Sequence, residues 1–327
     1  MAKVGICFIF NHPFPLQIPI LRKIYGPRFS KILFLIPFHR DEESDDVHTV
    51  YHGAYSFDAI IVDARDRIKE RFSDCEHVLF VHNDLMLAGR YNENSVTDLL
   101  NLNEHPFIAG VGKLGRFAFD WIWKAALPYK WRFPMDPFLG SGAEKAKQYL
   151  PSREVVSKIS EGAGHDGGPT HLEARESDLS YMYFYPFIYQ QIYMNPNHVD
   201  SNQVFEIEYP LYGGYSDIFT VPMAQFPEWI HTMGVLASMQ LFPEITIPTS
   251  LVWTFGRLNT EHTLQLKSSI LWQKDRELAN DINWVIDRFQ EGRDYIHPVK
   301  YERYAAGSYD NLIEEISNAS AMPKVEI

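Results

Sequence analysis

Short hydrophobic runs alternate with polar, helix-like stretches along the first hundred residues. Four runs rich in β-branched and aromatic side chains predict strands at residues 4–10, 31–37, 59–62 and 77–82. The stretches at 16–25 and 63–72 carry apolar residues at helical spacing and predict helices. Strands that alternate with helices are typical of βαβ units, so we expect an α/β fold in which helices cover a central, mostly parallel sheet.

Regular patterns return in the last third of the chain. Strands are expected at 205–209 and 217–222, and helices at 223–240, 244–253 and 274–290, the last of them amphipathic. The final ten residues are expected to fray, because chain ends with few apolar residues are rarely held by packing.

Two polar segments are expected to be mobile connections. Residues 161–171 hold several glycines and a proline, which favour a mobile loop over a helix or strand; a lid that orders over a ligand is the functional alternative. Residues 38–46 form a dense acidic run, which predicts a solvated loop and not a metal site.

The charge balance argues against nucleic acid as a partner. The chain has 30 Lys and Arg residues against 42 Asp and Glu residues, a net charge of −12, and such a field repels a phosphate backbone. A small phosphorylated ligand stays compatible with this charge, because one arginine, a metal ion or a ring of backbone amides can hold a diphosphate locally.

Cysteine usage and hydropathy predict a location in a reducing compartment. Only Cys7 and Cys75 occur, which excludes a disulfide scaffold and a four-cysteine zinc site. The apolar stretch near the first residue is too short for a secretory signal, and no run reaches the ~18 apolar residues of a spanning helix. We therefore expect a cytoplasmic protein without a membrane span, for which peripheral membrane contact stays open.

The segment His77-Val-Leu-Phe-Val-His-Asn-Asp carries the clearest chemistry. It predicts a buried strand that ends in His82, Asn83 and Asp84, and in open α/β sheets ligands bind at the carboxyl ends of strands. Period-two alternation puts His82 and Asp84 on one side, where an imidazole and a carboxylate can bind a divalent metal ion. The alternative is an ordinary strand-to-turn junction in which Asn83 and Asp84 bond to nearby backbone.

This order of elements resembles the nucleotide-binding half of GT-A-fold glycosyltransferases. Their Asp-x-Asp motif corresponds to His82-Asn83-Asp84, with His82 in place of the first aspartate and the second retained as Asp84. The resemblance implies a GT-A-like layered fold, with His82 and Asp84 binding Mn²⁺ or Mg²⁺ beside a nucleotide-diphosphate sugar. Some members of the fold return a third metal ligand from the C-terminal segment, where His262 is the candidate; otherwise His262 is a surface histidine.

A second point of resemblance lies at residues 209–222 and 241–249. In this fold a helix start presents a carboxylate to the acceptor hydroxyl, and Glu244 is similar to that residue. Asp217 is a second candidate base, and Gly213 and Gly214 would let the backbone approach sugar or phosphate. The structural alternatives are a carboxylate that complements the helix dipole for Glu244 and a turn residue for Asp217.

Further donor contacts follow from position at strand ends and helix starts. The expected nucleotide-binding residues are Asn11, His12, Pro37, His39, Arg65, Arg67 and Asn83. The irregular aromatic stretches at 117–123 and 129–134 are where acceptor-side elements are expected to begin.

The sequence thus predicts a glycosyltransferase that moves a sugar to a hydroxyl of a glycan or lipid-linked acceptor. Residues 1–105 would form the nucleotide-sugar half, 106–260 the acceptor-binding and catalytic half, and 261–327 a helical extension. The alternatives are a non-catalytic carbohydrate-binding or scaffold protein with the same fold, and a sugar nucleotidyltransferase. The last normally has a Gly-rich basic loop after the first strand, where this chain has Asn11-His-Pro-Phe-Pro.

Overall fold

A computed structural model of the chain describes residues 4–40, 44–53, 56–114, 131, 142–173, 204–304 and 312. The chain divides into two compact units, each built from separate segments. Unit 1 comprises residues 1–110, 217–227 and 259–327, and unit 2 comprises residues 111–216 and 228–258. Residues 261–327, expected to form a helical extension, are grouped in unit 1 with residues 1–110.

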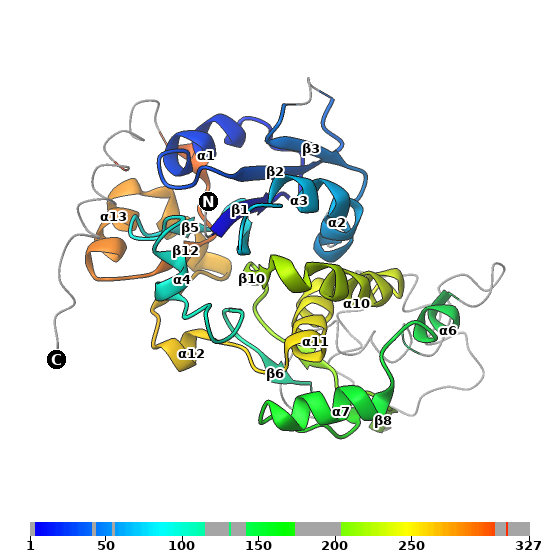
Figure 1. Ribbon diagram of the computed structural model, residues 1–327. Helices are drawn as coiled ribbons and strands as arrows, with labels where there is room; N and C mark the ends of the chain where they lie inside the picture. The colour runs from blue at the N-terminus through cyan, green and yellow to red at the C-terminus, as the bar shows by residue number, and fades with distance from the viewer. Residues whose placement is uncertain are drawn as a thin grey trace. The chain divides into compact units, whose positions relative to one another are not determined.

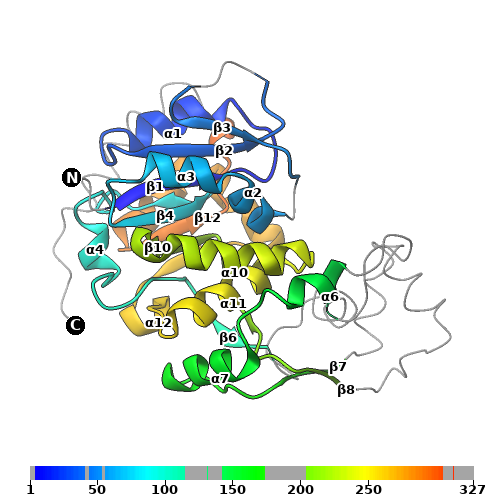
Figure 2. The ribbon, with the colours of Figure 1, turned by 45° about the vertical axis from the view of Figure 1, so that its right-hand side comes forward.

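A five-stranded sheet forms the centre of unit 1, and Figure 2 shows its strands side by side in the order β10-β4-β1-β2-β3; Figure 1 labels four of them, β1, β2, β3 and β10. The strands are β1 (Val4–Ile9), β2 (Ile32–Pro37), β3 (Val47–Val50), β4 (His77–His82) and β10 (Ile218–Pro222). Neighbouring strands from β4 to β3 are parallel, and β10 runs antiparallel to β4. The prediction of an α/β fold with a mostly parallel central sheet is confirmed.

Every residue of β1, β2 and β4 is buried, which matches the unbroken apolar runs expected of parallel strands covered on both faces. The covering helices are α1 (Gln17–Tyr25), α2 (Phe57–Asp63) and α3 (Arg65–Arg71). The chain moves from β1 outward to β3 and then crosses back to β4. This reversal makes the β1–β4 boundary a topological switch point, where the carboxyl ends of the strands leave a crevice.

One predicted strand is wrong, and one strand was missed. Residues 59–62 lie in helix α2, because a four-residue apolar run does not distinguish a strand from one buried turn of helix. The strand at this position in the sheet is β3, whose sequence Val-His-Thr-Val follows the acidic run. At the described end of that acidic run, Arg22 donates to both carboxylate oxygens of Asp46 at 2.7 and 2.6 Å.

The C-terminal part of unit 1 adds a three-stranded sheet in the order β11-β12-β5. Its strands are β5 (Met86–Leu87), β11 (Ser268–Ile270) and β12 (Tyr295–His297), and its helices are α4 (Val96–Leu99), α12 (Glu261–Leu264), η3 (Gln273–Asn280), α13 (Ile282–Gln290) and η4 (Tyr301–Arg303). The single helix expected at 274–290 is divided, because the Asp281 side chain accepts from Asn283 N at 2.9 Å and begins a new helix.

The described residues of unit 2 form two short antiparallel strand pairs, β6 with β9 and β7 with β8, and Figure 2 shows β7 beside β8. Its elements are β6 (Gly112–Lys113), α6 (Gly142–Lys147), α7 (Arg153–Gly162), β7 (Thr170–Glu173), β8 (Val204–Ile207), β9 (Tyr212–Gly213) and α11 (Pro243–Phe255), while η2 (Met223–Gln225) and α10 (Phe226–Ser238) lead into it. Helix α11 is buried along most of its length despite Pro248 inside it, and it is the helix expected at 244–253.

The loop in the glycine-rich segment at 161–171 is shorter than expected. Helix α7 continues to Gly162 and strand β7 begins at Thr170, so both ends belong to regular elements. Gly164 takes the left-handed conformation, with φ +86°, that ends the helix.

The aromatic stretches at 117–123 and 129–134, except Trp131, and the last ten residues lie outside the described residues. Among the described helices, none combines the length and the hydropathy needed to cross a lipid bilayer.

Candidate functional site

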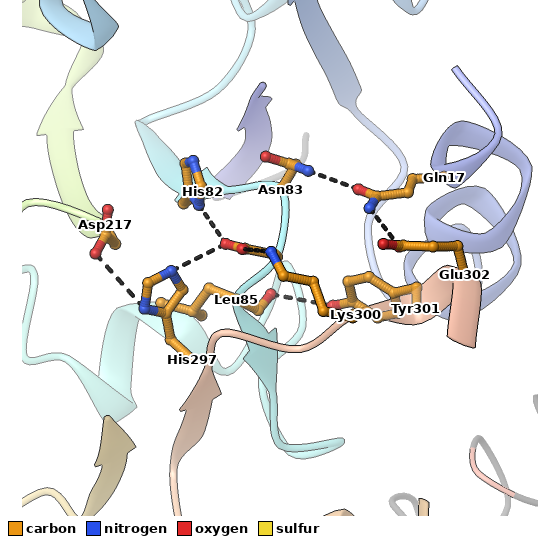
Figure 3. A network of polar contacts seen from close by, with 10 residues as sticks. Gln17, His82, Asn83, Leu85, Asp217, His297, Lys300, Tyr301 and Glu302 are labelled. Atoms are coloured by element: carbon orange, nitrogen blue, oxygen red, sulfur yellow. Dashed lines mark hydrogen bonds and ion pairs between the residues drawn. The ribbon is translucent and has the colours of Figure 1, made fainter. Parts of the chain in front are cut away.

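Three elements of unit 1 meet at the carboxyl end of β4. His82 is the last residue of β4, Asp217 immediately precedes β10, and His297 is the last residue of β12. The backbone N–H of His82 donates to the carbonyl oxygen of Asp217 at 2.8 Å, because the antiparallel start of β10 lies beside the end of β4. Figure 3 shows the side chains of Asp217 and His297 facing each other, with His82 nearby.

Asp84 is the buried carboxylate of this cluster. Its Oδ1 contacts Nδ1 of His82 and lies 2.9 Å from Nε2 of His297. Its Oδ2 accepts a hydrogen bond from Nζ of Lys300 at 2.7 Å. The backbone fixes the residue as well, since Val299 N donates to the carbonyl oxygen of Asp84 at 2.6 Å. Both carboxylate oxygens are therefore engaged by basic side chains.

The cluster shifts the pKa values of its members in opposite directions. Burial lowers the pKa of His82, but the charge of Asp84 and the hydrogen bond to it outweigh burial and raise that pKa above its ordinary value. Burial raises the pKa of Asp84, yet the neighbouring His82 and His297 hold it well below its usual range. Asp84 is therefore ionised and accepts hydrogen bonds without donating any.

His82, Asp217 and His297 form a group that can hold a metal ion. Each offers one ligand atom, and these atoms all lie within 4.8 Å of one another. Nε2 of His82 is buried and has no hydrogen-bond partner among the described residues, which is the condition of a nitrogen that fits a metal ion. Nδ1 of His297 lies 3.7 Å from Oδ2 of Asp217, close to the roughly 3 to 3.5 Å between two ligands of one ion.

Asn83, between the two site residues, connects the end of β4 to the rest of unit 1. Its amide donates to Oε1 of Gln17 at 2.6 Å, and the Gln17 amide donates to Glu302 at 2.8 Å, as Figure 3 shows. Asn83 is buried and joins the end of β4 to α1 and η4 through side-chain hydrogen bonds. Its nucleotide contact stays a prediction.

The other predicted donor contacts of unit 1 follow the same edge of the sheet. Asn11 and His12 come after β1, and Pro37 and His39 end or follow β2. Of these, His12 is exposed, Asn11 and His39 are half-buried, and Pro37 is buried. Their nucleotide contacts stay predictions.

Arg65 and Arg67 are engaged within unit 1. Arg67 donates to the carbonyl oxygen of Asp45 at 2.6 Å and to Glu70 at 2.9 Å. Arg65 donates to the carbonyl oxygen of Val62 at 3.4 Å. A phosphate would have to compete with these partners.

Gly213, Gly214 and Glu244 belong to unit 2, whereas Asp217 belongs to unit 1. Gly213 pairs with Gly112 between β9 and β6, and Gly214 N donates to the carbonyl oxygen of Glu244 at 3.0 Å. Glu244 follows Pro243 in the first turn of α11 and is half-buried. Their roles toward sugar and acceptor stay predictions.

His297 and Lys300 are the site residues that the sequence analysis missed. The sequence offered His262 as a candidate third ligand or as a surface histidine, and it lies exposed on α12. The sequence pattern could have predicted His297, since Tyr295-Ile-His-Pro resembles β4, in which a short apolar strand ends in a histidine. The ligand group also contains Asp217, which was predicted as a base, and does not contain Asp84.

Comparison with solved structures finds matches, and the one described here is distant. No protein-family model and no curated protein match the chain. Among solved structures, the chain is similar to one described as the apo structure of the bifunctional glycosyltransferase WbbM, with 11% sequence identity and a TM-score of 0.33. The match covers 97% of this chain and 50% of the other, so the chain spans about half the length of that protein. A likeness this distant carries no inference about activity.

Proposed function

We propose that this protein transfers a glycosyl group from a nucleotide-diphosphate sugar to a hydroxyl of a glycan or lipid-linked acceptor. The observation that carries the proposal is the meeting of His82, Asp217 and His297 at the carboxyl end of β4, beside the topological switch point. Ligands of open α/β sheets bind in this crevice, and a metal there lies where a diphosphate would enter.

In the proposal, His82, Asp217 and His297 hold one divalent metal ion. When bound, the metal acts as a Lewis acid that stabilises the negative charge on the departing diphosphate. Two imidazoles favour Zn²⁺, and Mn²⁺ as a transition metal tolerates them better than Mg²⁺, which prefers oxygen ligands. Of the two metals expected from the sequence, manganese fits this ligand set better.

The opposite end of the same edge offers exposed aromatic rings for the donor base. Phe38 follows β2 and Tyr51 follows β3; both side chains are exposed, and their ring centroids lie 6.3 Å apart. Phe38 has a φ of +52°, an unusual conformation for a side chain of this size. Strands lie ~4.8 Å apart, so the ends of β4 and β3 are separated by roughly 14 Å, a span suited to an extended nucleoside diphosphate.

Glu244 is the proposed general base, because Asp217 is assigned to the metal. A carboxylate at the start of a helix can take the proton of an attacking hydroxyl. Glu244→Gln is then expected to lower transfer by on the order of 10² to 10⁴-fold with little change in donor affinity. If Glu244 only complements the helix dipole, the substitution costs no more than about 1 kcal/mol of stability and leaves transfer near the wild-type rate.

Thermal unfolding with nucleotides and metal tests the proposal most directly. Uridine, guanosine and cytidine diphosphates would each be added with and without Mn²⁺, and one base is expected to raise the midpoint strongly only when metal is present. A ligand at 100 times its Kd stabilises the folded state by about 2.7 kcal/mol. No shift with any nucleotide would favour the carbohydrate-binding or scaffold alternative.

The activity itself requires a transfer assay on the same preparations. Consumption of the matching nucleotide sugar with an acceptor glycan would support transfer, whereas pyrophosphate-dependent formation of a nucleoside triphosphate would indicate a nucleotidyltransferase. His297→Ala is expected to abolish metal-dependent turnover. His262→Ala is the matched control, because it removes an exposed histidine outside the ligand group.

A further inference from the structure

We propose that residues 163–169 form a strap against strands β6 and β9, and that the strap opens when a phosphate group of a ligand replaces the Asp166 carboxylate on Lys113. The strap joins the end of α7 to the start of β7 within unit 2. The inference does not depend on glycosyl transfer or on the metal group of unit 1.

The strap contacts both residues of one cross-strand pair. Lys113 of β6 lies opposite Tyr212 of β9. Oδ2 of Asp166 lies 2.5 Å from Nζ of Lys113, and the Asp166 carbonyl oxygen accepts from the Tyr212 hydroxyl at 3.4 Å. The ring centroids of His165 and Tyr212 lie 5.2 Å apart. The strap thus lies against this pair, in which Tyr212 is fully buried.

Polar contacts hold the strap in place. The Gly168 N–H donates to Oδ1 of Asp166 at 2.8 Å, and the Ser157 hydroxyl on α7 donates to the Gly167 carbonyl oxygen at 2.8 Å. The strap sequence, Ala-Gly-His-Asp-Gly-Gly-Pro, contains no aliphatic side chain larger than proline. Segments that bury few apolar groups open locally at a low cost in free energy.

The two partners of the ion pair differ in exposure. The Lys113 side chain is 17% exposed, whereas the Asp166 side chain is 72% exposed. When the strap opens, the Asp166 carboxylate moves into water and the Lys113 ammonium stays on β6 without it. A partly buried charge that loses its partner is costly. An anion that binds Lys113 therefore favours the open strap, since a ligand that binds one state shifts the population toward it.

The replacing group has to compete with a tethered carboxylate. Asp166 belongs to the same chain, so its effective concentration at Lys113 is in the millimolar range or above. A free carboxylate carries the same single charge and gains nothing over Asp166. A phosphate group carries more negative charge and is a strong charge-assisted acceptor for a lysine ammonium. The structure therefore favours a phosphorylated ligand over a carboxylic acid.

Hydrogen exchange of the full chain measures strap opening at the amides of residues 163–168. Asp166→Asn keeps the side-chain size and removes its charge, so exchange is expected to become about two- to fivefold faster, as for the loss of one exposed ion pair. Gly167→Ala is expected to speed exchange on the order of tenfold or more, because an added Cβ would lie 2.5 Å from the Ser157 carbonyl oxygen.

Two matched variants control for general loosening of the fold. Gly162→Ala places a Cβ with nothing within 4 Å among the described residues, so strap exchange should stay at the wild-type rate. Asp74→Asn breaks a comparable ion pair with Lys31 in unit 1 and should also leave strap exchange unchanged.

Inorganic pyrophosphate, in buffer without added metal, is the probe for the ligand. In wild type, millimolar pyrophosphate is expected to speed strap exchange to about the Asp166→Asn rate. Sodium chloride and sodium acetate at the same ionic strength should change it by less than about twofold, since screening of one close ion pair is a small effect. In Lys113→Met, which lacks the ammonium, pyrophosphate should have no effect.

Acetylation of lysines, followed by mass spectrometry, shows whether the anion binds Lys113. Lys113 should react faster in Asp166→Asn than in wild type, and pyrophosphate should slow its reaction in that variant. Lys158, exposed on α7, is the internal control whose reaction neither change should alter.

Three results would contradict the proposal. Equal exchange in wild type, Asp166→Asn and Gly167→Ala would mean that neither the ion pair nor the close packing holds the strap closed. Equal effects of pyrophosphate and chloride would indicate charge screening without a bound anion. Slower strap exchange with pyrophosphate would mean that the anion binds the closed strap. Because these measurements use neither sugar nor metal, failure of the transfer assay alone would leave the inference standing.

Discussion

Two buried aspartates of unit 1 carry the same charge in different surroundings. Asp84 is surrounded by His82, His297 and Lys300. Asp294 accepts from Arg90 at 2.5 Å, from the Tyr91 hydroxyl at 2.6 Å and from the backbone N–H of Lys267 at 2.8 Å. Each carboxylate thus has three polar groups beside it, as a buried charge requires.

The two sites differ in whether the groups around the carboxylate have a second atom that can bind a metal ion. The donors around Asp294 are a guanidinium, a phenol and a peptide N–H, which have no lone pair suited to a metal ion. Two donors around Asp84 are imidazoles, each with a second nitrogen directed away from the carboxylate. The identity of the groups around a buried carboxylate therefore decides whether those groups could also bind a metal ion.

The largest effect on stability is expected at Asp294. Asp294→Ala leaves the partly buried Arg90, the Tyr91 hydroxyl and the Lys267 N–H without their acceptor, and removing one partner of a buried charge pair costs roughly 3 to 5 kcal/mol. Urea unfolding measures this loss. Zn²⁺ affinity of the folded variant should be unchanged, and a folded variant that no longer binds Zn²⁺ would remove the contrast with Asp84.

A metal-dependent loss of similar size is expected at His297. At 100 times its Kd, Zn²⁺ stabilises the wild type by about 2.7 kcal/mol, and His297→Ala should lose nearly all of this gain. Unfolding with and without Zn²⁺ checks the prediction, and His262→Ala should keep the full gain. Equal stabilisation of both variants would place the metal elsewhere.

A smaller effect is expected at Lys300, where a substitution should lower stability and raise Zn²⁺ affinity. Its side chain is 37% exposed, so losing its ion pair with Asp84 in Lys300→Met should cost at most about 1 kcal/mol of stability. Removing a positive charge near the metal should raise Zn²⁺ affinity, on the order of threefold to tenfold. Weaker Zn²⁺ binding would instead show that Lys300 is needed to orient Asp84.

The smallest effect concerns His77, at the other end of β4 from His82. Burial lowers the pKa of His77, partly offset by the nearby Glu76 charge, and its Nδ1 has no hydrogen-bond partner among the described residues. The unfolded chain therefore binds a proton more readily, and the folded state loses stability as the pH falls through the ordinary histidine pKa. Compared with His77→Gln, wild type should lose no more than about 1.4 kcal/mol per pH unit between pH 7 and 5.

Urea unfolding of both proteins at several pH values checks this sign. A wild-type stability that rises relative to the variant on acidification would mean that His77, like His82, gains a negatively charged partner in the folded state.

Local patterns predicted most of the central sheet. Strand β4 was predicted with its observed bounds, and β1, β2, β10 and α11 were predicted to within one or two residues. The errors lie where a short apolar run was all the information available. The segment 59–62 forms a helix, and the four residues of β3 were not distinguished from the acidic loop before them.

The residues of the candidate site also divide into those that a local pattern predicted and those that it did not. His82 and Asp84 were found because a buried strand that ends in polar residues is a local feature. His297 and Lys300 lie more than 200 residues further along the chain, and their strand β12 is three residues long. No local pattern predicts that β12 pairs with β5, which begins at Met86. This pairing brings the imidazole of His297 to the end of β4.

By itself, the sequence determined the α/β class, the buried strand and the histidine and aspartate at its end, because hydrophobic periodicity and strand polarity are properties of neighbouring residues. Only the tertiary structure decided that Asp217 and His297 join His82, and that Asp84 faces three basic nitrogens. The physical reason is that ligand geometry depends on pairing between distant strands. That pairing follows from burial of the whole unit and not from any single segment.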